Sequence, residues 1–193
     1  MACKSFTLSG IGLPCKDNMG GIKEVYIAKV DDIANINVAE GAEHYIDSIT
    51  LKQGSSFKTF KFRKGTASMT SSATSDDQIG NFSVTTELSL QFSKMDTGKR
   101  MEIMALCLEE CVAIVLDFNG QYWYLGYDSP ISATAATAQT GQAATDLNGY
   151  TVTLSDTSAV FPYPIIEEVI KGKKNEETGE MEGKLDIAVA PVA

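Results

Sequence analysis

The chain contains a long alternation of residue types that is typical of a single β-strand. Two sets of side chains alternate from residue 82 to residue 93: Phe82, Val84, Thr86, Leu88, Leu90 and Phe92 in one, and Ser83, Thr85, Glu87, Ser89, Gln91 and Ser93 in the other. A period of two predicts a strand with one buried face and one solvated face. At about 3.4 Å per residue this strand would span roughly 40 Å, about twice the usual length.

The residues before this strand predict its partner. Residues 57–72 form a first arm, and the polar segment 74–81, with Ile79 as its one large apolar residue, forms a tip. Together they predict a β-hairpin over residues 55–93. A domain of 193 residues has little core to cover so long a ribbon. We therefore expect part of its apolar row to pack on a neighbouring subunit, which favours assembly over catalysis.

The remaining patterns predict further strands at 22–30, 45–52, 111–116, 121–127 and 149–155. A helix is predicted over 97–110, with Asp96 as its N-cap. Its buried stripe is expected to be Met101, Met104, Ala105 and Leu108, at helical spacing. The predicted fold class is mainly β (α+β): a β-sandwich or barrel with one flanking helix and a long β-hairpin arm.

The expected organisation has three parts. Residues 1–21, rich in Gly and turn formers, predict an extended N-terminal arm. Residues 22–166 form the β domain, including the hairpin 55–93 and the helix 97–110. Residues 167–193 predict a charged C-terminal tail, in which Leu185, Ile187 and Val189 could form a strand that adds to another subunit's sheet.

Charge limits the possible partners. The net charge is −9, from 16 basic and 25 acidic residues. Proteins that bind the phosphate backbone normally display a basic surface, so adhesive nucleic-acid binding is disfavoured. A conduit that passes DNA without holding it would instead carry negative charge. No apolar run approaches the roughly 20 residues of a membrane span, and no secretory signal is visible, so we expect a cytoplasmic origin and no membrane partner.

No pattern predicts an enzyme or a cofactor. His44 is the single histidine, and no nucleophile lies in a recognisable elbow. The Gly98-Lys99 pair does not complete a phosphate-binding loop, because Ser93 and Arg100 occupy the positions that need glycine and a hydroxyl residue. Carboxylate pairs such as Asp76-Asp77 are expected to be solvated or to contact subunits.

The four cysteines are Cys3, Cys15, Cys107 and Cys111. Without a secretory signal they are expected to be reduced, and we expect buried thiols. A metal site or a disulfide is the alternative. The distance along the chain between Cys3 and Cys15 is poor for zinc, whereas Cys107 and Cys111 have an acceptable spacing.

Four segments carry a resemblance to a known family: residues 18–28, 62–71, 84–90 and 122–127. They resemble the tail tube proteins of tailed bacteriophages and the related head–tail connector ring proteins, including virion structural proteins of crAss-like and other gut phages. The similarity covers roughly residues 1 to 165 and leaves the charged tail outside it. Its motifs are structural and of moderate specificity.

The resemblance implies a virion protein, assembled in the host bacterial cytoplasm, that forms stacked homo-oligomeric rings. These would be hexamers or dodecamers that contact other tail or portal proteins and line a channel for DNA without binding it specifically. The implied lumen or subunit-contact residues are Ser83, Thr85, Glu87, Ser89 and Gln91. Leu88, Leu90 and Ile79 are added as contact candidates, and replacing Leu88 and Leu90 by Asp is expected to abolish assembly but leave the monomer folded. A capsid-decorating or baseplate protein with the same sandwich is the alternative.

Overall fold

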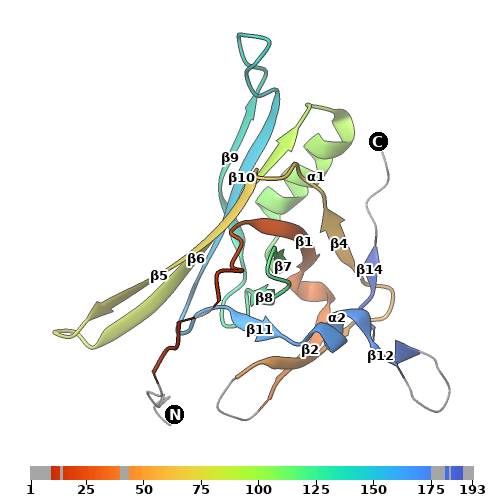
Figure 1. Cartoon of the computed structure of the whole chain (residues 1–193). Coiled ribbons are helices and arrows are strands. Elements are labelled where there is room, and N and C mark those ends of the chain that lie inside the picture. The colour runs from red at the N-terminus through yellow and green to blue at the C-terminus, as the bar shows by residue number, and fades with distance from the viewer. Residues whose placement is uncertain (1–9, 14, 40–43, 175–180, 183, 189–193) are drawn as a thin grey trace.

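The computed structural model describes residues 10–13, 15–39, 44–174, 181–182 and 184–188. It is mainly β, with two large sheets and one main helix at the side of the smaller sheet (Figure 1). The predicted fold class, a β-sandwich with a flanking helix and a long hairpin arm, is therefore confirmed.

The elements follow the alternation of apolar and polar residues along the chain. The strands are β1 (Ile22–Lys29), β2 (Ile33–Val38), β3 (Ile46–Leu51), β4 (Phe57–Phe60), β5 (Ala67–Asp76), β6 (Asn81–Ser93), β7 (Cys111–Asp117), β8 (Tyr122–Leu125), β9 (Ser132–Gln139), β10 (Gly149–Ser158), β11 (Tyr163–Ile165), β12 (Lys173–Lys174), β13 (Met181–Glu182) and β14 (Ile187–Ala188). The helices are α1 (Thr97–Leu108), α2 (Glu167–Lys171) and the short 3-10 helix η1 (Val30–Asp32).

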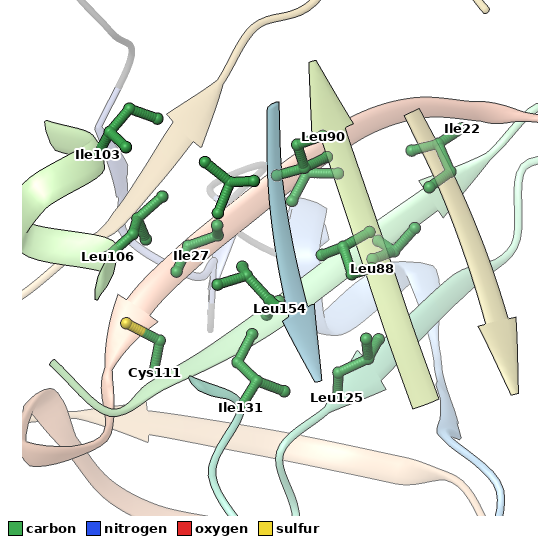
Figure 2. Packing of buried hydrophobic residues seen from close by; sticks show 14 of the residues in the cluster. Ile22, Ile27, Leu88, Leu90, Ile103, Leu106, Cys111, Leu125, Ile131 and Leu154 are labelled. Carbon is green, nitrogen blue, oxygen red and sulfur yellow. The ribbon is translucent and has the colours of Figure 1, made fainter. Parts of the chain in front are cut away.

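Two sheets face each other across the main core. The eight-stranded sheet has the order β14-β4-β1-β7-β8-β11-β3-β2, and the four-stranded sheet has the order β5-β6-β10-β9. Leu88 and Leu90 of β6 and Leu154 of β10 belong to one buried cluster with Ile27 of β1 and Leu125 of β8 (Figure 2). The apolar row of the long strand thus packs on the larger sheet of its own chain.

The eight-stranded sheet is buried on both faces at its centre. Val115 of β7 faces the main core, whereas its neighbours Ile114 and Leu116 belong to a second cluster that includes Val169 and Ile170 of α2. Burial on both faces explains why residues 111–116 read as one continuous apolar run.

The hairpin is shorter than the sequence predicts. β5 and β6 pair from Ala67↔Leu90 to Asp76↔Asn81, but β4 pairs with β1 in the other sheet. A turn separates β4 from β5, where Thr66 N–H donates to the Arg63 carbonyl at 3.1 Å and Gly65 has φ 80°. The predicted ribbon 55–93 is therefore two units, and the hairpin is 67–93. Its tip still projects from the body (Figure 1).

The apolar row of β6 is buried largely within its own chain. Val84, Leu88 and Leu90 have no exposed surface, and Thr86 and Phe92 are also buried. Leu88 and Leu90 are thus core residues of the monomer, and their prediction as subunit contacts is wrong. Only Ile79 and Phe82, at the projecting end, remain exposed. An Asp at position 88 or 90 would place a charge in the core, so we now expect those variants to unfold.

The main helix begins where predicted but turns the opposite face to the core. The Asp96 carboxylate accepts from Lys99 N–H at 2.8 Å, which confirms the N-cap. The buried residues of α1 are Ile103 and Leu106, whereas Met101, Met104 and Leu108 are exposed, so the predicted stripe is wrong. Residues 101–108 are apolar on both sides of the helix, and spacing alone does not select between the two stripes.

The C-terminal segment is part of the body where it is described. α2 contributes to the second core cluster together with Leu185, and β14 pairs with β4 of the same chain through Ile187↔Phe57. The prediction of a solvated tail whose strand joins another subunit is wrong for these residues; Val189 lies outside the described residues. In the N-terminal arm, residues 10–13 and 15–20 form no strand or helix, as predicted.

Replacing Leu88 by Ala should lower the free energy of unfolding by about 2–5 kcal/mol, because the removed methyl groups leave a cavity between the two sheets. Chemical denaturation of the purified protein measures this change. Ser89→Ala, on the opposite face of the same strand, is the matched control and should change stability by less than about 0.5 kcal/mol. Equal effects of both substitutions would contradict the assigned facing of β6.

Candidate functional site

The solvent-facing side of the four-stranded sheet presents mainly hydroxyl-bearing side chains. Cross-strand pairing places Ser89 beside Ser68 and Thr153, and Glu87 beside Thr70 and Ser155. We name this surface the hydroxyl face. Its members are Ser68, Thr70, Ser72, Ser83, Thr85, Glu87, Ser89, Gln91, Thr151, Thr153, Ser155 and Thr157, each opposite in phase to the buried residues of β6 and β10 or the half-buried residues of β5.

The hydroxyl face carries very little charge. None of the strands β5, β6, β9 and β10 contains Lys or Arg. Glu87 is the single charged member of the face, and Asp156, the other acid of the central strands, points into the core. Such a surface offers phosphate groups no cation, so electrostatic binding of a nucleic-acid backbone there is unfavourable.

All five residues predicted for a lumen or a subunit contact in β6 lie on this face: Ser83, Thr85, Glu87, Ser89 and Gln91. Their role there remains a prediction. Sequence reasoning missed the partner hydroxyls of β5 and β10. The signal was present, since Thr151, Thr153 and Ser155 alternate with Tyr150, Val152 and Leu154 in the same way.

The same sheet ends in two edge strands, β5 and β9, and α1 contacts β9. Among the described residues, β5 pairs in this sheet only with β6, and β9 only with β10. The β9 sequence is Ser-Ala-Thr-Ala-Ala-Thr-Ala-Gln, and β5 is similarly small and polar. Neither strand contains the Lys or Pro that commonly protects an edge from pairing with another chain. One register shift interrupts the β9–β10 ladder, and pairing is regular from Ala135 to Gln139.

A groove of about 250 Å³ lies between the start of β5, the turn after β7 and residues 18–22. The Asp117 carboxylate, which lines this groove, accepts hydrogen bonds from Gln121 N–H at 2.9 Å and from Trp123 Nε1–H at 3.2 Å. The Asn119 side chain accepts from Met19 N–H and donates to Asn18, each at 2.8 Å. These polar groups fasten the N-terminal segment and the β7–β8 turn, which is a structural role.

The cysteines differ from the prediction of buried thiols. Cys111 is buried, and burial raises its pKa to about 11, whereas Cys15 and Cys107 are exposed. All three are free thiols. Cys107 is exposed because α1 turns Ile103 and Leu106 to the core. No group of three or more metal-ligating side chains comes together in the part of the chain that the structure describes.

Two buried polar side chains, Tyr124 and Asp156, lie at the end of the core near Thr86. The Tyr124 hydroxyl and the Asp156 Oδ1 atom are buried without a hydrogen-bond partner in the described structure, and both residues line a cavity of about 10 Å³. Burial raises the pKa of Asp156, although N–H groups of Gly126 and Thr86 act in the opposite direction. The fold therefore favours the protonated carboxyl.

Asp156→Asn should stabilise the protein most at neutral pH. A raised folded-state pKa means that protonation of Asp156 adds stability as the pH falls through that pKa, and the gain is complete below the unfolded value of about 3.9. Asn is neutral throughout, so the difference in Tm between the variant and the parent should shrink from pH 7 to pH 4.

The matched comparison is Asp146→Asn. N–H donation from Ala143 and Gln142 lowers the pKa of Asp146. The ionised Asp146 therefore stabilises the fold at neutral pH, and this advantage should fade on acidification. Thermal unfolding across pH measures both variants. An Asp156→Asn difference that grows toward pH 4 would contradict the assignment.

Among the described residues, no helix is long and apolar enough to cross a bilayer. Comparison with known proteins found no relative of this chain: no family model, no curated protein and no solved structure matches it.

Proposed function

We propose that this chain is a structural virion protein that assembles into rings of a phage tail tube or head–tail connector and lines a DNA conduit. The resemblance of four segments to that family motivates the proposal. Within the structure, the observation that carries it is the four-stranded sheet, which combines two edge strands that contain no Lys or Pro with a hydroxyl face that carries one charge. A ring closed through these edges would need no enzymatic group.

The directions of the strands suit closure of a ring. β5 is antiparallel to β6, β6 to β10 and β10 to β9, so the two edge strands run in opposite directions. Rotation about an axis along the strands would bring β5 of one copy beside β9 of the next in antiparallel orientation. The four-stranded sheet would then continue from copy to copy, and closure would pair both of its edge strands.

The hydroxyl face would form the wall of the lumen in such a ring. It presents hydroxyl groups and one carboxylate, Glu87, to the passing DNA. The net charge of −9 adds weak repulsion. The mechanism is passive, because a wall without Lys or Arg releases no counterions from DNA and so gains no binding free energy from that source.

Placing lysines at Ala135 and Thr137 of β9 should abolish assembly, because two charged side chains on an edge strand oppose pairing with another strand. The control is Thr151→Lys with Thr153→Lys, which adds the same charges in the same cross-strand rows of the central strand β10. Light scattering after size exclusion and negative-stain electron microscopy measure the result. We expect monomers from the edge variant and rings from the control.

Rings from the edge variant would contradict pairing through β9. A parent protein that forms no rings, or that appears only as knobs on capsids, would overturn the tube proposal and favour a decorating protein.

A basic lumen should retain DNA. Replacing Glu87, Ser89 and Gln91 by Lys adds three cations and removes one anion per copy, and the logarithm of DNA affinity should then fall linearly with the logarithm of salt concentration. Filter binding of duplex DNA at several salt concentrations measures this. The same three lysines at the exposed positions Thr97, Gly98 and Glu102 of α1 are the control. Equal retention by both variants would contradict a lumenal hydroxyl face.

A further inference from the structure

α1 presents an apolar stripe to solvent on the side opposite its buried residues. Met101, Met104 and Leu108 are 59%, 45% and 78% exposed, although they repeat at the spacing that normally marks a buried helix face. Ala105 and Cys107 beside them are also exposed. We name this surface the α1 stripe. A contiguous apolar face of this kind commonly marks an interaction site.

A second apolar patch lies at the tip of the β5–β6 hairpin. Ile79 is 67% exposed and Phe82 54% exposed. The tip is ordered by Asp76, whose carboxylate accepts from Gln78 N–H at 2.9 Å and Ile79 N–H at 3.3 Å. This turn holds Ile79 beside the end of the ribbon and keeps Asp77 exposed.

The tip and the N-terminal half of the α1 stripe have complementary charge, whereas the C-terminal end at Leu108 is followed by the exposed Glu109 and Glu110. The tip carries Asp76 and Asp77, and the chain contains no Lys or Arg between residues 65 and 93. The N-terminal end of the α1 stripe is flanked by exposed Lys94 and Arg100, at the positive end of the helix dipole. Apolar contact at the centre with opposite charges at the rim is the usual anatomy of a specific protein interface.

The two patches are too far apart to meet within one chain. β6 runs from the tip at Asn81 to Ser93, and α1 begins just beyond at Thr97, so the 13 residues of β6 separate them. At about 3.4 Å per residue this separation is roughly 44 Å. Figure 1 shows the hairpin tip and α1 at opposite ends of the molecule. A contact between them therefore joins two copies head to tail.

We infer that the hairpin tip of one copy docks on the α1 stripe of a copy in the next ring and so stacks the rings. The tip points along the strands, which is the direction of the proposed ring axis, whereas the open edges of β5 and β9 point sideways. Lateral pairing closes a ring, and axial docking of Ile79 and Phe82 on Met101 and Met104 joins ring to ring. This inference rests on the proposed function, because it assigns the axial contact of that same assembly.

Repetition around the ring explains how so small a contact can hold. Specific interfaces usually bury about 1,200–2,000 Å² in total, more than a hairpin tip and one helix face offer. Two isolated copies would therefore associate weakly through it. A ring presents every tip to the next ring at once, and such multivalent binding multiplies the strength of the single contact.

Cross-linking to Cys107 tests the inference directly, because this native thiol is exposed beside the α1 stripe. In the full chain, Ile79→Cys should form a disulfide with Cys107 of another copy under mild oxidation. Since each copy has both groups, the product should be a ladder of covalent multimers on a non-reducing gel. Adding Cys107→Ser to the Ile79→Cys chain is the control and should remove the ladder, although Cys3 and Cys15 remain.

A second set of variants separates stacking from ring closure. Met104→Asp and Ile79→Asp should leave single rings in electron micrographs and abolish stacked columns. Met104→Leu and Ile79→Leu, which keep the apolar surface, should preserve the columns. Exchange of charges provides a further check: Arg100→Glu should reduce the number of columns several-fold, and adding Asp77→Lys should restore them.

The outcomes distinguish the two proposals. Columns that persist in Met104→Asp, or a ladder that survives Cys107→Ser, overturn the docking of the tip on α1 and leave the ring intact. A parent chain that forms no rings overturns the proposed function whatever the gel shows. Rings with the Cys107-dependent ladder, and loss of columns in both Asp variants, support the inference.

Discussion

The structure depends on the packing of β6 against the larger sheet. This strand is central in its sheet, between β5 and β10. Its inner face, including Leu88 and Leu90, fills the space above β1 and β7, and its outer face remains wet. One strand thus determines both the core and the surface that we propose as a lumen. A shift of one residue in its register would exchange the two faces, so burial of these leucines fixes which side chains reach solvent.

The position of the hairpin also determines which strands form the edges of the four-stranded sheet. Because β6 and β10 occupy the centre of the sheet, the small, uncharged strands β5 and β9 are left as its edges. The sheet projects beyond the body at the hairpin tip (Figure 1). In the proposed stacked ring, the two edge strands would pair with each other, the hydroxyl face would line the lumen, and the two apolar patches would contact each other.

Much of the fold could be predicted from the sequence. Strict alternation over residues 82–93 is specific to a strand, and the aspartate before α1 is specific to a helix start, so β6 and the Asp96 cap were both predicted. Alternation also separated the outward row of β6, from Ser83 to Ser93, from the buried residues. It did not show that Leu88 and Leu90 are buried within their own chain, because burial within one chain and burial by a neighbouring subunit produce the same sequence pattern.

The failures have related causes. The break between β4 and β5 depends on which sheet each arm joins, and Phe57–Phe60 pairs with β1 through contacts distant in sequence. The face of α1 was misassigned because both of its sides are apolar, and only tertiary packing selects Ile103 and Leu106. Many of the residues after 167 are charged, so the sequence did not reveal that Val169, Ile170 and Leu185 are buried in the second core cluster. Local patterns specify elements more reliably than they specify partners.

A cryo-electron microscopy reconstruction of the assembled protein tests the central claim most directly. The account predicts a closed ring in which β5 of each copy is hydrogen-bonded to β9 of the next, with Ser89, Glu87 and Thr153 facing the hollow axis. An assembly in which these residues face outward, or in which both edges of the four-stranded sheet remain unpaired, would contradict it.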